Sequence, residues 1–246
     1  MKLKAIKWLL LLICLAPAVS LADDLEGLLA RNLEAIGGAE NWARIKNVRV
    51  RLTIEEPDFQ VEATYVASRS GSMRIDIQQN GQTVFREGLD EGTAWQWTEA
   101  DGVSIQDEQS AAALRHGIEF PGRFFTLMDL YLNGTSVALE GQVLEGDSTQ
   151  WRVRVTLADD FSRDYFIDET TALIVREHDR RAFHPAADPT AVLIETRKEE
   201  PEWVNGVLLY RISRNINLET GEWLATTRVH SFEHNIELTE GYFKAQ

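Results

Sequence analysis

The chain of 246 residues has a single cysteine, Cys14. It also lacks an apolar run of the about 20 residues that are needed to cross a bilayer, since its longest run is shorter. That run belongs instead to a secretory signal, which combines a positive region, a short apolar core and a small-x-small cleavage site. The three parts are Lys2, Lys4 and Lys7, then Trp8–Leu15, then Ser20-Leu21-Ala22. We therefore predict a signal peptide at residues 1–22, cleaved after Ala22, and export to the periplasm.

Export in this form removes the cysteine from the mature chain. A lipidated cysteine directly follows a small-residue box, whereas Cys14 follows Leu12-Ile13 in the middle of the apolar core. We expect residues 23–246 to form a single domain without a disulfide bond or thiol chemistry.

Basic residues are also scarce. The chain has 25 Lys and Arg against 39 Asp and Glu; without the three signal lysines the count is 25 − 3 = 22, and 22 − 39 gives −17. A protein this acidic is repelled by nucleic acids and by anionic membrane surfaces. The charge excludes nucleic acid as a partner and favours solubility or a basic protein partner.

Catalytic signatures are absent from the sequence. It contains no Gly-x-Ser-x-Gly elbow, no phosphate-binding glycine loop and no His-Glu-x-x-His. His230 and His234 would stand about 13 Å apart on a strand, too far to share a metal ion. Four residues in a proline-containing loop could ligate a metal ion, namely His178, Asp179, His184 and Asp188. The favoured interpretation is that they form a solvated polar loop. We predict a non-enzymatic protein without cofactor or metal.

What the sequence does contain begins with an amphipathic helix. Its apolar residues recur at spacings of three and four, and are Leu25, Leu28, Leu29, Leu33 and Ile36. Gly37-Gly38 ends this helix, because glycine adopts the left-handed conformation that a helix end requires. A short turn with Trp42 and Ile45 follows. Such a helix needs the apolar face of a sheet to cover.

Most of the remaining chain alternates as β-strands, about ten or eleven in number. Early examples are Val48–Glu55, Phe59–Ala67, Met73–Gln79, Thr83–Leu89 and Thr93–Thr98; later ones include Trp151–Leu157, Asp164–Asp168, Leu173–Glu177 and Val192–Lys198. Asn80-Gly81 between two alternating runs is a strong hairpin signal. So many strands in an antiparallel meander curl, and the sheet then closes or leaves a trough.

One segment interrupts the meander. Residues Ser110–His116 predict a short helix, and Phe120–Leu132 form a dense apolar piece after Pro121-Gly122. A buried core helix and a mobile lid remain equally open here. The strand faces leave a similar choice, because aromatic and aliphatic rows such as Trp95 with Trp97 suit either a filled barrel core or an apolar cavity.

Several motifs, in order along the chain, together resemble the outer-membrane lipoprotein-sorting-protein-like family. They are Leu33–Gly38, Trp42–Lys46, Tyr165–Leu173, Val204–Val207, Asn235–Leu238 and Tyr242-Phe243. The resemblance implies the LolA-like fold of periplasmic lipoprotein carriers: mainly β (α+β), an incomplete antiparallel barrel with a helical lid over a hydrophobic cavity. It also implies that Arg69 holds the lid closed, although Ser70 replaces the proline of the family's Arg-Pro pair.

The function that the resemblance implies is a monomeric carrier that holds lipid or lipoprotein acyl chains for transport toward the outer membrane. We expect its cavity to be lined by Tyr65, Met73, Ile75, Trp95, Trp97, Phe124, Phe125 and Met128. An alternative is an envelope sensor that binds a membrane-associated protein through the same half-barrel. A third alternative, an enzyme on this scaffold, would use His178 and His184.

Overall fold

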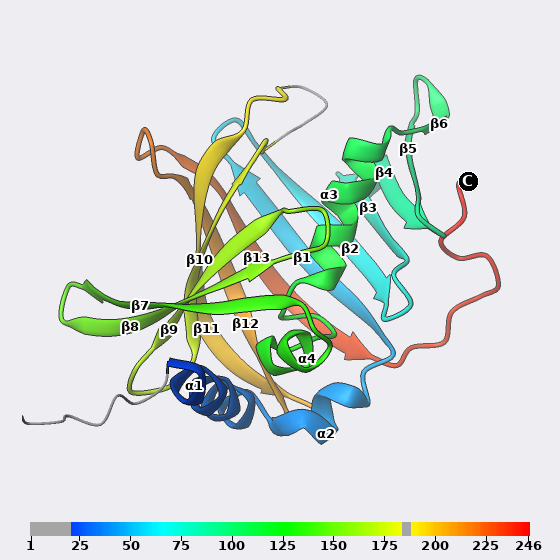
Figure 1. The fold of residues 1–246 in the computed structure, drawn as a ribbon. Coiled ribbons are helices and arrows are strands. Elements are labelled where there is room, and N and C mark those ends of the chain that lie inside the picture. Colours follow the sequence, from blue (N-terminus) through cyan, green and yellow to red (C-terminus); the bar gives the residue numbers. More distant parts are fainter. Residues whose placement is uncertain (1–20, 184–187) are drawn as a thin grey trace, which may run out of the picture.

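The computed structural model describes residues 21–183 and 188–246, which form one long antiparallel sheet with four helices (Figure 1). Residues 1–20 of the predicted signal peptide, Cys14 included, and His184 lie outside the described residues. No helix in the described part is both long and apolar enough to span a membrane.

The sheet contains 13 strands in the order β6-β5-β4-β3-β2-β1-β13-β12-β11-β10-β9-β8-β7. Their bounds are β1 Asn47–Glu56, β2 Phe59–Ser68, β3 Met73–Gln79, β4 Gln82–Asp90, β5 Thr93–Thr98, β6 Gly102–Ile105, β7 Ser136–Glu145, β8 Ser148–Thr156, β9 Ser162–Asp168, β10 Ile174–Arg181, β11 Val192–Val204, β12 Val207–Asn217 and β13 Trp223–His234. First and last strands pair in the middle of the sheet. Its two edges, β6 and β7, are therefore consecutive in the chain.

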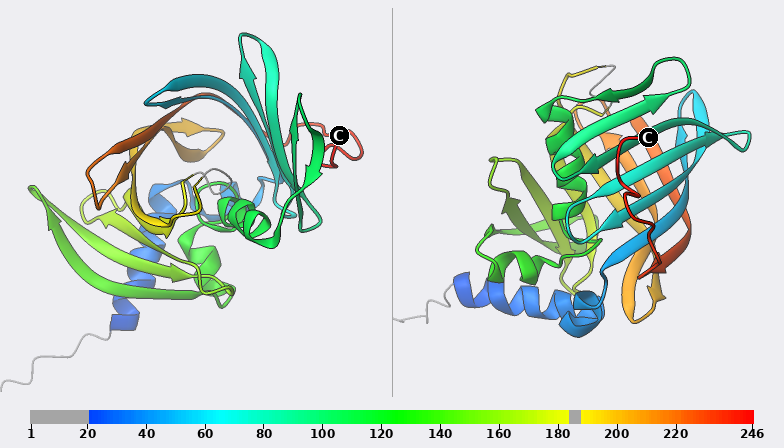
Figure 2. Two further views of the ribbon diagram at one scale, coloured as in Figure 1. Left: turned by 90° about the horizontal axis from the view of Figure 1, so that it is seen from above. Right: turned by 90° about the vertical axis from the view of Figure 1, so that its right-hand side faces the viewer.

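This topology confirms the predicted incomplete barrel. The sheet curls but its edges β6 and β7 do not pair, and the view from above shows α3 (Glu108–Glu119) in the opening between the two ends of the sheet (Figure 2). Residues 106–135 connect these two edges, and we call this connection the cover. It contains α3 and α4 (Leu127–Leu132), separated at Pro121-Gly122 as the sequence predicts.

Helix α1 (Leu21–Ala35) buries Leu25, Leu28 and Leu29 of the predicted stripe against the sheet end that contains β7, β8 and β9, whereas Leu33 and Ile36 pack with the other half of the core. Gly37 then adopts φ 114°, and a Cβ there would stand 2.2 Å from the carbonyl oxygen of Gly206 in the β11–β12 turn. Both the helix end and this close approach require glycine. Helix α2 (Gly38–Ala43) follows, with Trp42 buried.

Two apolar clusters form the core. The first core cluster joins α2 and α3 to strands β1 to β5 and to the start of β12, and includes Val50, Tyr65, Met73 and Phe124. The second core cluster joins α1 and α4 to β7, β8 and β9 and includes Leu29, Leu127 and Tyr165. The middle strands β10 to β13 connect the two clusters, so the space between them lies over the centre of the sheet.

Two strand assignments differ from the sequence prediction. The count is 13 where ten or eleven were expected, and β6 (Gly102–Ile105) was not predicted because four residues give too short an alternation. Strand β10 continues to Arg181, whereas the prediction ended it at Glu177. His178 and Asp179 therefore belong to a strand and not to a loop.

Candidate functional site

A cavity of about 660 Å³ lies between the two core clusters, beneath the cover. Its walls come from α1, α2, the cover and the inner faces of β1 and β9 to β13. From the cover it is lined by small residues of α3, Ala112, Ala113 and Gly117, and by Phe120 and Phe125. Its volume lies within the range of pockets that hold small molecules, about 300–1,000 Å³.

Near α2, the cavity is apolar. We call this part the apolar end, and its residues are Ile36, Trp42, Val50, Leu52, Phe125, Leu208, Leu209, Val229 and Phe232. The backbone N–H of Leu208 donates to the carbonyl of Ile36, which fixes the start of β12 beneath α2. Strand pairing places Val50 opposite Phe232, so apolar side chains continue from strand to strand.

Toward the other end of the same strands, the lining becomes polar. On β12 it changes from Leu208 and Leu209 to Ser213 and Asn215, and on β13 from Val229 to Thr227. Ser213 pairs with Lys198 on β11 and with Thr227 on β13, so one polar row crosses three strands. The expected cavity is present, and its lining is mixed rather than uniformly hydrophobic.

An ionic network occupies this polar side, and we call it the cavity cluster: Arg163, Glu177, Asp179, Arg181 and Lys198. Lys198 Nζ lies 3.2 Å from Glu177 Oε1, and Arg163 Nη1 lies 3.3 Å from Glu177 Oε2. Asp179 accepts from both arginines, with Arg163 Nη2 at 2.7 Å from its Oδ2. Three cations thus share two carboxylates.

Burial and mutual charge shift the pKa values in the cavity cluster. Burial alone would raise the pKa of Glu177, but Lys198 and then Arg163 outweigh it and hold the pKa below its ordinary value. The pKa of Arg181 is lowered, first by burial, against which Asp179 acts, and further by the neighbouring Arg163. The ion pair with Asp179 therefore offsets only part of the cost of burying Arg181.

Arg69, the predicted lid latch, follows β2 directly and ties the cover to α2. Its Nη2 donates to the carbonyl oxygens of Trp42 and Phe124, each at 2.6 Å, and its Nε donates to that of Ile45 at 2.8 Å. Its guanidinium carbon also lies 5.1 Å from the Phe125 ring centre, within cation–π range. One side chain thus joins three backbone segments, although Ser70 replaces the proline of the family pair.

A second attachment of the cover lies at the C-terminal part of α3. His116 Nε2 lies 2.7 Å from Asp159 Oδ2 in the β8–β9 turn, and the imidazole stacks on Phe161 with ring centres 4.1 Å apart. Hydrogen bonding with His116 is the largest cause that holds the pKa of Asp159 below its ordinary value. This pair was not predicted from the sequence, because two residues 43 apart in the chain show no local pattern.

The structure brings one predicted lining residue, Phe125, to the cavity wall. Tyr65, Met73 and Phe124 are buried in the first core cluster, with Ile75 packed against it. Tyr65 supports the cavity indirectly, because the guanidinium of the lining residue Arg123 lies 4.1 Å from its ring centre. Met128 packs against the second core cluster.

Trp95 and Trp97 do not line the cavity. They share one face of β5, as predicted, but Ala94 on the opposite face is the residue that joins the first core cluster. Trp95 instead packs flat on Gly88 and donates its Nε1 hydrogen to the carbonyl of Phe243, 2.8 Å away. The C-terminal segment therefore covers this side of the sheet.

The cavity cluster was not predicted from the sequence, and the reason lies in the local composition of β10. Residues Arg176–Arg181 are six consecutive charged or imidazole residues, so no alternation distinguishes the two faces of β10. Charged residues at every second position, Glu177, Asp179 and Arg181, were the only signal in the sequence. His178 points to the other face, where its Nε2 lies 2.7 Å from Glu195 Oε2. Among the described residues no group of three His, Cys, Asp or Glu is arranged to hold a metal.

No family model matches the chain, and no curated protein matches its sequence. Solved structures do match in fold. A DUF1329 family protein from Desulfovibrio piger ATCC 29098 is similar with a TM-score of 0.57 and 10% identity, over 89% of this chain and 96% of that chain.

Two further solved structures share the fold. A LolA superfamily protein from Nitrosomonas europaea is similar with a TM-score of 0.57 and 9% identity, over 92% of this chain and 98% of that chain. An outer membrane lipoprotein-sorting protein domain from Vibrio parahaemolyticus has a TM-score of 0.56 and 9% identity, over 90% and 95% of the two chains. The family resemblance predicted from the motifs is thus confirmed at the level of the fold.

Proposed function

We propose that this protein is a periplasmic carrier that holds an acyl chain of a lipid or lipoprotein in its cavity. The observation that carries the proposal is the partly open cavity of about 660 Å³, with one apolar end, beneath a cover fastened by side chains. The fold it shares with a LolA superfamily protein and a lipoprotein-sorting domain supports the same conclusion.

The affinity would come from removing the chain from water. Each buried methylene contributes about 0.8 kcal/mol, so a chain of about twelve carbons contributes on the order of 10 kcal/mol before ordering costs. The apolar end supplies aliphatic and aromatic partners from α2, β1, β12 and β13. No bond is made or broken in this function, so the site needs no catalytic group.

A carrier must also release its cargo, and the cover provides the moving part. It is one continuous segment between the two unpaired sheet edges, so it can swing away without breaking any strand pairing. Opening costs the hydrogen bonds of Arg69 and the His116–Asp159 contact. It also exposes apolar side chains of the cover, among them Phe124 and Leu127, that are buried in the two core clusters. Cargo that holds the cover open would repay part of this cost, and closure would expel it.

Native mass spectrometry of the mature protein, purified from envelope extract without detergent, tests the proposal. We expect a reproducible added mass that corresponds to a phospholipid or another acyl-chain molecule. Gly117→Trp should abolish it, because Gly117 lines the cavity and its Cβ position is open, so the indole takes the space of the chain. Gly27→Trp on α1 is the matched control, since that helical glycine also has open space but lies outside the cavity.

The uptake rate of added lipid tests the latch within the same assay. Arg69→Met should load faster than the native protein because the carbonyls of Trp42 and Phe124 lose their shared donor. A native protein that carries no added mass and takes up no added lipid would contradict the carrier function. Loss of cargo in Gly27→Trp as well would show that the effect of Gly117→Trp is not specific to the cavity.

A further inference from the structure

The two ends of the cavity differ in chemistry along the same strands. At the α2 end, the side chains of Leu209, Val229 and Phe232 offer only apolar contact. At the other end, Lys198 and Arg181 line the same cavity. A ligand that matches both ends must itself be apolar at one end and charged at the other.

The sign of that charge follows from the cavity cluster. Arg163, Arg181 and Lys198 are three cations, and the carboxylates in contact with them among residues 21–183 and 188–246 are Glu177 and Asp179. One positive charge is left over in a partly buried place, where an unpaired charge is costly. Their side chains are 15%, 31% and 22% exposed, so the cations are held in place yet remain within reach from the cavity.

Access to this end comes from solvent. Arg180, Pro189 and Ala191 line the cavity beside the cluster and are exposed. Arg180 pairs with Glu219, so it adds no further free positive charge. The apolar end is closed by α1 and α2, which lie together at the opposite end of the strands (Figure 1).

From this arrangement we propose that the cargo is an amphiphile with an anionic head group, a phosphate or a carboxylate. Its chain occupies the apolar end and its head group lies against Lys198 and Arg181 of the cavity cluster. The inference rests on the proposed function and specifies the class of cargo. Ionised acceptors make the stronger hydrogen bonds with such cations, so the head group contributes affinity as well as orientation.

Displacement of a neutral fluorescent probe, N-phenyl-1-naphthylamine, from the mature protein distinguishes head groups at constant chain length. Dodecyl phosphate and dodecanoate are the anionic ligands, monododecanoylglycerol is the neutral ligand, and inorganic phosphate is the anion without a chain. We expect both anionic ligands to bind at least about tenfold more tightly than the neutral one. Inorganic phosphate alone should not displace the probe.

Lys198→Met is the variant that tests the assignment. It leaves two cations with two carboxylates, and Glu177 keeps Arg163 as a partner, so the fold should persist. The preference for the anionic ligands should fall about tenfold, while binding of the neutral ligand stays the same. Lys198→Arg should restore the preference. Lys46→Met, an exposed lysine outside the cavity, changes the net charge equally and should leave all affinities unchanged.

Each other outcome has a definite meaning. Equal affinity for charged and neutral ligands in the native protein would overturn the head-group assignment and leave the carrier function intact. Tight binding of inorganic phosphate would overturn the amphiphile and indicate a plain anion site. If neither the probe nor any amphiphile binds, the result contradicts the carrier function, and the head-group assignment is overturned with it. Should Lys198→Met not fold, Arg181→Gln removes a cation from the same end and replaces it in the test.

Discussion

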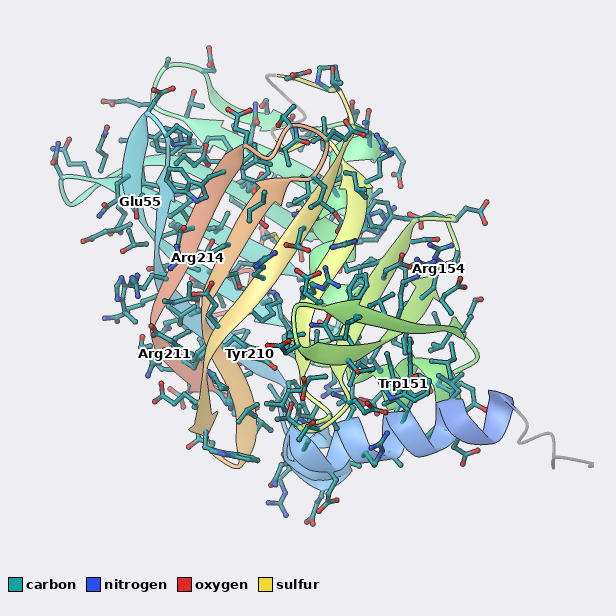
Figure 3. All side chains as sticks on the ribbon, turned by 90° about the vertical axis from the view of Figure 1, so that its left-hand side faces the viewer. Glu55, Trp151, Arg154, Tyr210, Arg211 and Arg214 are labelled. Atoms are coloured by element: carbon teal, nitrogen blue, oxygen red, sulfur yellow. The ribbon has the colours of Figure 1, made fainter. Side chains whose placement is uncertain are left out.

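Strands β10 and β11 carry two ionic networks, one on each face of the same sheet. On β10, the cavity cluster contains every second residue, which are Glu177, Asp179 and Arg181. The outer cluster uses the residues between them, which are Arg176, His178, Glu195 and Arg197, together with Glu145 from the β7–β8 hairpin. Figure 3 shows the molecule from the side of these strands.

The two networks differ in the balance between positively and negatively charged side chains. The outer cluster sets two arginines against two glutamates, and its central carboxylate, Glu195, accepts from His178, Arg176 and Arg197. The cavity cluster sets three cations against two carboxylates. Counting arginine and lysine among the described residues of these two clusters, the surplus positive charge lies on the side that faces the cavity, which associates it with a ligand.

Asp179→Asn breaks the cavity cluster and should have the largest effect. The Asp179 side chain is 2% exposed and accepts from Arg163 and Arg181, so its loss leaves three cations with one carboxylate. We expect the free energy of unfolding to fall by about 3–5 kcal/mol. Urea unfolding at neutral pH measures it.

The matched control for that variant is Asp160→Asn. Asp160 is exposed in the β8–β9 turn, and its φ of 66° suits asparagine as well as aspartate. Its stability should stay within about 0.5 kcal/mol of the native protein. A loss below about 1 kcal/mol in Asp179→Asn would contradict the view that Asp179 holds the cluster together.

Glu195→Gln breaks the outer cluster and reveals its pH dependence. Burial alone would raise the pKa of Glu195, but hydrogen bonds from His178, Arg197 and Arg176 lower it from 4.5 to about 2. The lower folded-state pKa means that Glu195 stabilises the fold above pH 4.5 and that this contribution disappears as the pH falls toward 2. The shift corresponds to about 3 kcal/mol.

Urea unfolding of native protein and Glu195→Gln at several pH values tests this. The variant should be about 3 kcal/mol less stable at neutral pH, and the difference should shrink to near zero as the pH approaches 2. Glu237→Gln, at an exposed glutamate, should match the native protein throughout. A difference independent of pH would show that Glu195 acts through packing instead of charge.

The variant with the smallest expected effect distinguishes the two networks most clearly. Lys198→Met should change stability by less than about 1 kcal/mol, because it balances the cavity cluster. Arg176→Met, in the outer cluster, should cost about 2 kcal/mol, because it removes donors from Gln150 and Glu195. Equal losses in thermal or urea unfolding would mean that the two networks do not differ in the way their charges suggest.

The fold was largely predictable from local signals. Alternation in β1, β2 and β3 placed Val50, Tyr65 and Met73 on buried faces, and each belongs to the first core cluster. Asn80-Gly81 forms the predicted hairpin turn, with φ of 52° and 77°. What alternation cannot decide is which face of a strand points inward. Trp95 and Trp97 face outward because Phe243, 148 residues later, supplies the partner of Trp95.

The site was predictable in part. The cover and Arg69 were expected from the interrupted meander and the family resemblance, and the structure shows Arg69 bonded to Phe124 in the cover. The cavity cluster depends on the register of β9, β10 and β11, which sets Glu177 beside both Tyr165 and Thr196. Pairing between strands distant in sequence leaves no trace in a run of consecutive charges.

Photolabelling with two fatty acids tests whether the cavity holds an acyl chain in the proposed orientation. One carries a diazirine at the end of the chain, and the other carries it beside the carboxylate; both are loaded into the native protein and the labelled peptides are sequenced. The terminal probe should label the apolar end, at residues such as Val50, Leu209 and Val229, and the other should label peptides that contain Lys198 or Arg181. Labelling outside the cavity, at the exposed Trp203 for example, or the same sites for both probes, would contradict a chain held in the cavity in this orientation.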